Sequence, residues 1–167
     1  MGYLFRRRRS YRLILCREYV IIMLEVNFLS MNNINDFFDL FDNHLKRFSQ
    51  NNVCYCVSWN ISREEFYKEI EIPVKIEHKS LRDANRRVAE TLILQGILQG
   101  YIAYIDGVPV GWCNANDKKN YKQFGISKDC TESVFGKTKS IMCFEIAENY
   151  KNRGIASALW DLPTLMR

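Results

Sequence analysis

The chain has 167 residues, of which 47% are hydrophobic and 26% are charged, and its formal net charge is +5. These values are those of a soluble globular protein with one domain, and no repeat, low-complexity tract or linker divides the sequence. The net charge belongs to residues 1–22, which hold six arginines and one glutamate, while the other 18 basic and 18 acidic residues cancel. This balanced body argues against nucleic acid as a partner.

Residues 1–22 are predicted to form a disordered basic N-terminal extension, and the folded domain is expected to span residues 23–167. Arg12, Arg17 and Glu18 interrupt the apolar run that a signal peptide needs. No apolar run approaches the roughly 20 residues that span a bilayer. We favour a start of translation at Met23. The alternative is an arm whose arginines bind nucleic acid or anionic lipid.

Two elements are expected next along the chain. A strand is predicted over residues 23–29, where Leu24, Val26 and Phe28 share one face. Asn33 then caps an amphipathic helix, with Asp36 three residues on as an acidic capping partner. The apolar face of this helix follows helical spacing and comprises Phe37, Leu40, Phe41, Leu45 and Phe48.

Serine caps predict the two helices that follow. Ser62 with Glu65 forms a capping box for a short helix, which is expected to end before Pro73. Ser80 begins a longer helix that is expected to end near Gly96.

A hairpin and a loop come next. Residues 100–105 and 108–113 are predicted strands, and Asp106 with Gly107 between them is a strong signal for a two-residue hairpin turn. Residues 114–138 are polar and are expected to form a long loop, for which a substrate lid and simple flexibility are both open.

The stretch over residues 139–159 carries the clearest chemical pattern. A strand is predicted over residues 140–146, followed by a basic turn with Lys151, Arg153 and Gly154, and then by a helix. A glycine lets the backbone approach an anion, and a helix N-terminus offers unpaired N–H groups. With one glycine in the turn, the pattern is neither a Walker phosphate loop nor a GxGxxG dinucleotide site, so a pyrophosphate held by a short loop is expected.

This stretch resembles motif A of the GNAT superfamily of N-acetyltransferases, in which a strand precedes Q/R-x-x-G-x-G/A. Lys151 stands at the first position, Gly154 at the glycine and Ala156 at the final small residue. Lysine keeps the charge of arginine but lacks its planar donors. The upstream sequence YIAYIDGVPVGWC also resembles the Asp-Gly hairpin that precedes motif A in the family, and the resemblance covers about residues 23–159.

The resemblance implies an α/β fold with a GNAT-like mixed central sheet flanked by helices. It also implies transfer of an acetyl group from acetyl-CoA to a primary amine on a small molecule or a peptide. Glu145 would serve as general base, with a solvated strand carboxylate as the alternative. By the same resemblance, acetyl-CoA would be bound by Cys143, Phe144, Ile146, Lys151, Asn152, Arg153, Gly154, Ile155 and Ala156.

The acceptor side is implied by a second similarity. In a subset of GNAT-like proteins, an element similar to the Cys-aromatic-Cys…Trp pattern of residues 51–60 precedes the central helix. The substrate-binding residues would then be Tyr55, Cys56, Trp59, Trp112 and Asn114. Ordinary core packing of these residues is the alternative.

The family continues beyond motif A with a further strand and helix, whereas residues 160–167 follow it here. Pro163 is expected to break the helix early, and no tyrosine beyond Tyr150 can act as general acid. The chain is therefore expected to be C-terminally truncated, with the C-terminal strands and helix missing. One alternative is a non-catalytic coenzyme A-binding or regulatory module, and another is a basic-arm binder of nucleic acid or anionic surfaces.

The six cysteines do not indicate a metal site. They form no CxxC pair, and the sequence has two histidines. Reduced thiols, a cytoplasmic location and no bound metal are expected.

Overall fold

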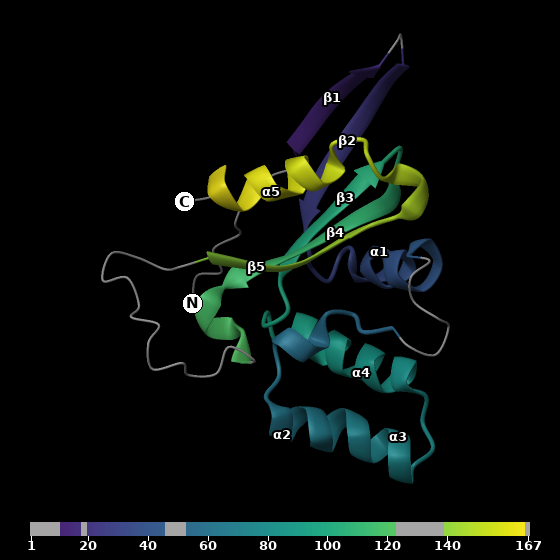
Figure 1. Ribbon diagram of the computed structural model, residues 1–167, viewed down its shortest axis with the longest axis vertical. Helices are drawn as coiled ribbons and strands as arrows, with labels where there is room; N and C mark the ends of the chain where they lie inside the picture. The colour runs from purple at the N-terminus through teal and green to yellow at the C-terminus, as the bar shows by residue number, and fades with distance from the viewer. Residues whose placement is uncertain (1–10, 18–19, 46–52, 123–138, 166–167) are drawn as a thin grey trace, which may run out of the picture.

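A five-stranded antiparallel sheet forms the centre of the protein (Figure 1). The computed structural model describes residues 11–17, 20–45, 53–122 and 139–165. The strands lie side by side in chain order: β1 (Tyr11–Arg17), β2 (Val20–Phe28), β3 (Gly100–Ile105), β4 (Val108–Asp117) and β5 (Lys139–Ile146). Each neighbouring pair is antiparallel, so the predicted mixed sheet is wrong for the described strands.

The first hairpin corrects the expectation for the N-terminal extension. Strand β1 and the first residues of β2 lie inside residues 1–22, and they pair in register from Tyr11–Val26 to Arg17–Val20. The disorder predicted there is therefore wrong for residues 11–17 and 20–22, where runs of apolar and β-branched residues form paired strands at the edge of the described sheet. Arg6 and the other residues before position 11 lie outside the described part of the chain.

Helices cover both faces of the sheet. One face carries α5 (Ile155–Leu165), which follows the short η6 turn (Glu148–Tyr150) (Figure 1). The other face carries the remaining helices. They are α1 (Ile34–Asp39), η1 (Leu40–His44), η2 (Val57–Trp59), α2 (Arg63–Phe66), η3 (Tyr67–Glu71), α3 (Ile72–Ile76) and α4 (Leu81–Leu94), and η4 (Lys118–Asn120) follows β4. None of the described helices combines the length and apolar character needed to cross a membrane.

Two apolar cores lie on opposite faces of the sheet. Trp112 points into the core shared with α1 and α4, whereas its neighbour Cys113 belongs to the core under α5. Leu24 and Val26 of β2 are buried in the α5 core as predicted, but Phe28 on the same strand is 44% exposed. The alternation of Trp112 and Cys113 between the two cores is the expected behaviour of a strand that is covered on both faces.

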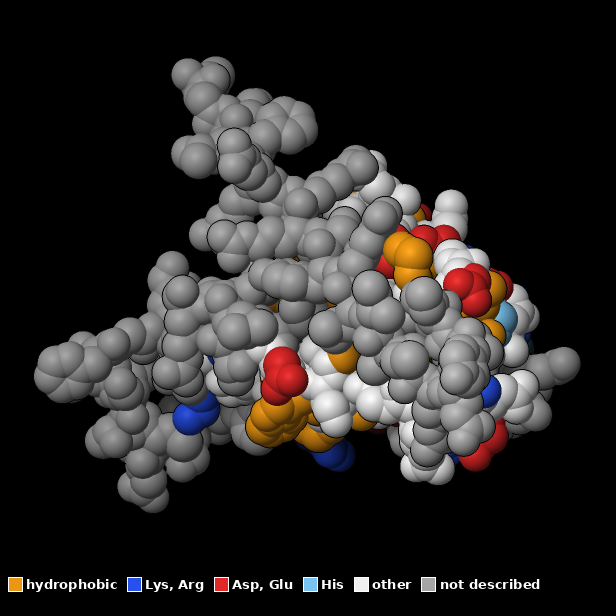
Figure 2. All heavy atoms as spheres, turned by 90° about the horizontal axis from the view of Figure 1, so that it is seen from above, with side chains coloured by type: hydrophobic (Ala, Val, Ile, Leu, Met, Phe, Trp, Pro, Cys, Tyr) orange, Lys and Arg blue, Asp and Glu red, His pale blue; other side chains and the backbone are white. Residues whose placement is uncertain are grey.

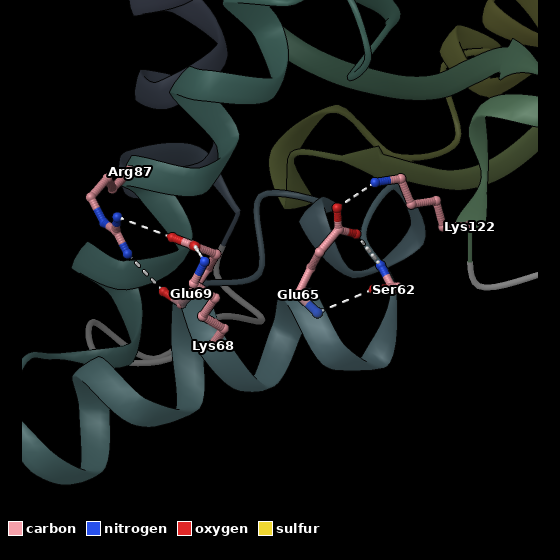
Figure 3. Close-up of polar contacts among 6 residues, drawn as sticks. All are labelled: Ser62, Glu65, Lys68, Glu69, Arg87 and Lys122. Atoms are coloured by element: carbon pink, nitrogen blue, oxygen red, sulfur yellow. Dashed lines mark hydrogen bonds and ion pairs between the residues drawn. The ribbon is translucent and has the colours of Figure 1, made fainter.

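The predicted helix starts are confirmed. Ser62 accepts a hydrogen bond from the Glu65 amide, and the Glu65 carboxylate accepts one from the Ser62 amide, which completes the capping box (Figure 3). Ser80 Oγ accepts a hydrogen bond from the Asp83 amide at 3.0 Å. Asn33 occupies the predicted N-cap position of α1, but the predicted capping bonds are wrong: the Asn33 side chain accepts from the Ser30 amide, and Asp36 accepts from the Tyr104 hydroxyl.

Side-chain contacts join the helical elements. Arg87 of α4 donates to the Glu69 backbone carbonyl at 2.8 Å and also pairs with the Glu69 carboxylate (Figure 3). Lys122 pairs with the same Glu65 that caps α2. Helix α4 ends in a Schellman motif at Gly96, which has a φ of +67°. The Gly96 amide donates a hydrogen bond to the Ile93 carbonyl, and the Ile97 amide donates one to the Leu92 carbonyl.

The two prolines do not end helices where the sequence predicted it. The helical run that begins after Ser62 continues through Pro73 to Ile76. A stretch of π-helix over Tyr67–Glu71 ends two residues before Pro73 and changes the hydrogen-bond pattern of the run. Proline, which has no N–H group, is thereby accommodated within the helical run. Pro163 lies in the last turn of α5, where it removes one helical bond without ending the helix at that point.

The predicted hairpin between β3 and β4 is confirmed. Asp106 and Gly107 have φ values of +51° and +79°, as a tight hairpin turn requires. The following strand extends to Asp117, and Tyr121 is buried, so the long loop begins later than predicted. Its residues 123–138 lie outside the described part of the chain.

Gly111 permits the close packing of α5 on the sheet. A methyl group at this position would lie 2.9 Å from Ile146 Cδ1 and 3.1 Å from Ile155 Cγ2. We expect Gly111→Ala to lower the free energy of unfolding by about 1–3 kcal/mol, because the core has no space for the methyl group. Urea denaturation measures this loss.

Ile146→Val supplies the control, because it removes the Cδ1 atom that the new methyl would meet. The double variant should lose less stability than the two single variants together. Strictly additive losses would contradict the proposed steric contact.

Candidate functional site

A pocket of about 470 Å³ lies where β5 ends and α5 begins. It extends around the edge strand, since residues from both faces of β5 contribute to its wall. Its lining comprises Leu45, Phe144, Glu145, Ile146, Glu148, Tyr150, Lys151, Asn152, Gly154, Ile155, Ala156 and Ser157. The strand, the turn and the start of the helix therefore form one concave site.

The turn between β5 and α5 is fixed by backbone hydrogen bonds. The Ala147 amide donates to the Val110 carbonyl at 2.9 Å, which holds the end of β5 against β4. Asn152 and Gly154 then take φ values of +60° and +79°, which turn the chain into the helix. The Ala158 amide donates to the Gly154 carbonyl at 3.0 Å, so Gly154 is the residue from which α5 begins.

The first turn of α5 forms part of the pocket wall. A helix leaves its first amides without intrahelical acceptors and carries a partial positive charge at that end. Ile155 is 1% exposed and Leu159 is fully buried against the sheet, so apolar packing fixes the position of the helix start. Ala156 and Ser157 are exposed at the pocket wall. The arrangement suits an anionic ligand.

Two cations flank this turn. Lys151 Nζ lies 2.6 Å from Glu148 Oε2, and both side chains are more than half exposed, so the pair contributes little to stability. The Arg153 guanidinium lies 5.1 Å from the centre of the Tyr150 ring. Glu148 and Tyr150 therefore hold the two cations near the turn. An anionic ligand could bind Lys151 in place of Glu148, and Arg153 while it remains on the Tyr150 ring.

Glu145 is a nearly buried carboxylate in the pocket wall. It is 5% exposed and lies opposite Trp112 in the β4–β5 ladder, on the sheet face turned toward α1 and α4. The Cys143 thiol donates to its Oε1 atom across 3.5 Å. Phe144 and Ile146 point to the other face, into the core under α5. Because β5 is an edge strand, the pocket reaches all three residues.

The structure brings together most of the residues predicted to bind acetyl-CoA. Phe144, Ile146 and the turn from Lys151 to Ala156 lie around the pocket, with Arg153 exposed beside it. Cys143 is not part of the pocket lining. The binding role of these residues remains a prediction.

Most of the predicted acceptor residues lie in the core. Tyr55, Cys56, Trp112 and Asn114 are each no more than 1% exposed, and Trp59 is half-buried. None of them lines the pocket. This placement favours the alternative of core packing over contact with an acceptor.

Tyr55 belongs to a part-buried polar cluster centred on Asp42. Its hydroxyl donates to Asp42, and burial raises the pKa of Tyr55, with the hydrogen bond to Asp42 as the next cause. Arg82 and Arg86 of α4 pair with the same carboxylate at 2.9 and 2.6 Å. Arg86 also lies 3.9 Å from the centre of the Phe38 ring. This cluster joins the first helix, the central helix and the segment between them.

Two buried donors face the helical layer from β4. Within the described part of the chain, Trp112 Nε1 and Asn114 Nδ2 have no hydrogen-bond partner. The Asn114 oxygen accepts from the Tyr121 hydroxyl at 2.8 Å, and burial raises the pKa of Tyr121.

Sequence reasoning missed four residues of the pocket: Leu45, Glu148, Tyr150 and Ser157. Leu45 comes from a helix about a hundred residues earlier in the chain, and no local pattern could have indicated it. Tyr150 is the last tyrosine of the chain, and its position directly before the predicted turn is the signal that could have found it. Its presence in the wall supplies a hydroxyl group to which the resemblance assigned no role.

No metal centre is apparent in the described residues, and the described part of the face in Figure 2 shows no basic patch. The histidines, cysteines and acids of the described residues form no group of three that could bind a metal ion. Side chains of both charges are scattered over the described part of the face in Figure 2, without a patch of one sign. Arg6 to Arg9, on which the basic-arm alternative depends, lie outside the described residues.

Comparisons with known proteins assign no family. No protein-family model and no curated protein matches the chain. A ribosomal-protein-alanine N-acetyltransferase from Brucella melitensis biovar Abortus 2308 is a structural neighbour at 16% identity and a TM-score of 0.47, over 84% of this chain and 69% of that one. An uncharacterized protein from Bacillus halodurans is 14% identical, with a TM-score of 0.41, over 90% of this chain and 61% of its own. Likenesses this distant assign neither a family nor an activity to the chain.

Gly154 is required for its backbone conformation. Nothing lies within 4 Å of the position that a Cβ atom would take there, but the φ of +79° is unfavourable for residues that have one. We expect Gly154→Ala to cost about 1 kcal/mol of unfolding free energy. Gly154→Asn should cost less, because asparagine tolerates the left-handed region better. Chemical denaturation of both variants tests this, and equal stability of the alanine variant and the parent protein would contradict it.

Proposed function

We propose that the protein is a coenzyme A-dependent acyltransferase that transfers an acetyl group from acetyl-CoA to a primary amine. The observation that carries this proposal is the shared pocket. A single concavity joins the nearly buried carboxylate of Glu145 to the glycine turn and the first turn of α5. The resemblance of residues 100–113 and 139–156 to GNAT motifs supports the same assignment.

The residues around the turn fit a coenzyme A ligand. The amides at the start of α5, with Lys151 and Arg153 beside them, would bind the pyrophosphate. Gly154 leaves open space where a side chain would otherwise stand. Phe144 and Ile146 line the pocket nearby and offer apolar contact to the pantetheine arm. When bound, acetyl-CoA supplies the thioester carbonyl that an amine attacks.

In this proposal, Glu145 would accept a proton from the acceptor amine. A primary amine must lose a proton to become a nucleophile, and a carboxylate within hydrogen-bond reach can accept it. Glu145 lies in the pocket wall but faces the helical layer, away from Phe144 and Ile146. The amine would therefore approach from the side of Leu45, while coenzyme A lies along the turn. The acceptor would be a small molecule or a peptide.

Titration with acetyl-CoA tests the binding half of the proposal. At a concentration one hundred times Kd, the ligand should stabilise the protein by about 2.7 kcal/mol in thermal unfolding. Gly154→Asp should abolish this gain, because it puts a carboxylate where the pyrophosphate would bind.

Gly107→Asp is the matched control for this titration. Gly107 has the same φ of +79° and the same open surroundings, but it lies in the β3–β4 turn and outside the pocket. This variant should bind acetyl-CoA like the parent protein. If the parent protein is folded and does not bind, or if both aspartate variants bind equally well, the proposed site is wrong.

Glu145→Gln tests the catalytic half. The substitution preserves volume and removes the base, so the rate of acetyl transfer should fall about 10²–10⁴-fold while acetyl-CoA binding remains. Release of the coenzyme A thiol, followed over a panel of primary amines, measures the rate. Glu90→Gln, at an exposed position of α4, is the control and should leave the rate unchanged.

Two outcomes separate the alternatives. Equal rates in the Glu145→Gln variant and the parent protein would remove Glu145 from the chemistry. Binding of acetyl-CoA without transfer to any amine would favour the non-catalytic coenzyme A-binding module.

A further inference from the structure

Trp160 is an exposed aromatic side chain beside the proposed site, and no step of the proposed reaction uses it. It is 56% exposed, whereas Trp112 is fully buried and Trp59 is half-buried. A tryptophan ring carries a large apolar surface that is stabilised when a partner covers it. The exposed surface of Trp160 is therefore available to a ligand of the pocket.

The fold places the Trp160 ring at the rim of the pocket. Trp160 follows Ala156 and Ser157 by one helical turn, and since both of these line the pocket, the three residues share one face of α5. The indole stacks on the ring of Phe144, a pocket residue of β5, with the ring centres 6.1 Å apart and the ring planes at 28°. Phe144 covers one face of the indole, and the large exposed fraction of Trp160 accords with an open opposite face.

We propose that Trp160 stacks on the adenine ring of coenzyme A and thereby strengthens the binding of the coenzyme. This inference rests on the proposed function. It adds a contact for the base, which the residues already assigned to the pyrophosphate and the pantetheine arm do not supply. Trp160 is in this role a binding residue and takes no part in the transfer of the acyl group.

The flat surface of the indole suits a planar base. Aromatic rings attract one another in stacked arrangements, and protein aromatic side chains stack on nucleobases in the same way. The pantetheine arm is flexible and largely aliphatic, and it has apolar contacts of its own at Phe144 and Ile146 inside the pocket. The base is thus the part of coenzyme A that best matches Trp160.

The spacing along α5 also suits a nucleotide. Trp160 lies six residues after Gly154, in the turn that is proposed to bind the pyrophosphate. At 1.5 Å per residue, the helix advances by about 9 Å between them. The ribose of coenzyme A joins the pyrophosphate to the base over a distance of this order. A pyrophosphate at the start of α5 and a base on Trp160 therefore fit one ligand.

Two ligands separate the base from the pantetheine arm. Acetyl-CoA carries both, whereas 3′-phosphoadenosine 5′-diphosphate carries the base and the pyrophosphate without the arm. We expect Trp160→Ala to weaken the binding of both ligands by the same factor, about 5- to 150-fold, as for the loss of one stack between a base and an aromatic ring. Isothermal titration calorimetry of the full chain measures the four Kd values.

Two variants serve as controls. Trp160→Phe keeps an aromatic ring and should retain most of the affinity for both ligands. Leu94→Ala removes a similarly exposed apolar side chain from α4, outside the pocket lining, and should bind both ligands like the parent protein.

Fluorescence supplies a second readout. Acetyl-CoA should quench the tryptophan emission of the parent protein and protect it from acrylamide, because the base covers the exposed indole. In Trp160→Phe, in which Trp59 and Trp112 remain, the ligand should leave the emission unchanged.

The results separate this inference from the proposed function. If the parent protein binds acetyl-CoA, three results would each overturn the role of Trp160 alone: unchanged affinity in Trp160→Ala, a loss confined to acetyl-CoA, or a parent protein that does not bind 3′-phosphoadenosine 5′-diphosphate. If the folded parent protein does not bind acetyl-CoA, the proposed function fails, and this inference fails with it.

Discussion

The seating of α5 on the sheet is the contact on which the candidate site depends. Ile155 and Leu159 pack against the strand surface at Gly111, where the lack of a side chain lets the helix approach. This apolar contact fixes the position of the helix, and with it the position of the first turn of α5 in the pocket wall. The left-handed residues of the preceding turn are needed because the chain must reverse within a few residues to reach that position. The anion binding that we propose for the site would thus follow from packing, and the flanking cations would add to it.

The edge position of β5 joins two chemically different sides. A central strand would separate the apolar core under α5 from the helical layer, but the pocket wraps around the free edge of β5 and touches both. Glu145 faces one side, and Phe144 and Ile146 face the other. A ligand along the turn and a second ligand near Leu45 would therefore meet at the main chain of β5, which is the arrangement that a group transfer between two substrates requires.

Local patterns in the sequence predicted the elements whose causes are local. The Asp106–Gly107 turn, the serine caps and the glycine turn at Gly154 each depend on a few adjacent residues, and the structure places turns or helix starts at all of them. The helical run through Pro73 was not predicted, because it depends on a stretch of π-helix over Tyr67–Glu71. Residue types alone do not indicate where the hydrogen bonds of a helix change from the α to the π pattern. The hairpin at β1 was not predicted, because Arg12 and Arg17 interrupt its apolar residues and these residues show no alternation of polar and apolar types.

The site residues show the same limit. Aromatic and cysteine side chains suit a core and a pocket equally well, so composition could not show that Tyr55 and Trp112 would be buried. Asp42 and the arginines of α4, which fix Tyr55 in place, lie far from it in sequence. Residues that act within one segment, such as Gly154, were therefore predictable, whereas those that depend on distant partners, such as Leu45, were not.

The irregular pairing of β5 has a consequence for how this strand can vary in length. Asn114 lies opposite Cys143, but the next residue of β4 lies opposite Ile141, so Met142 is an extra residue in a β-bulge. Ile141 packs under α5, while Cys143, two residues on, faces the helical layer. Removing Met142 would restore regular alternation along β5. Either Cys143 and Glu145 or the residues before position 142 would then face the opposite side of the sheet. The bulge thus decides which side chains of β5 face each side of the sheet. A related protein without it would need a compensating insertion to keep Glu145 in the pocket.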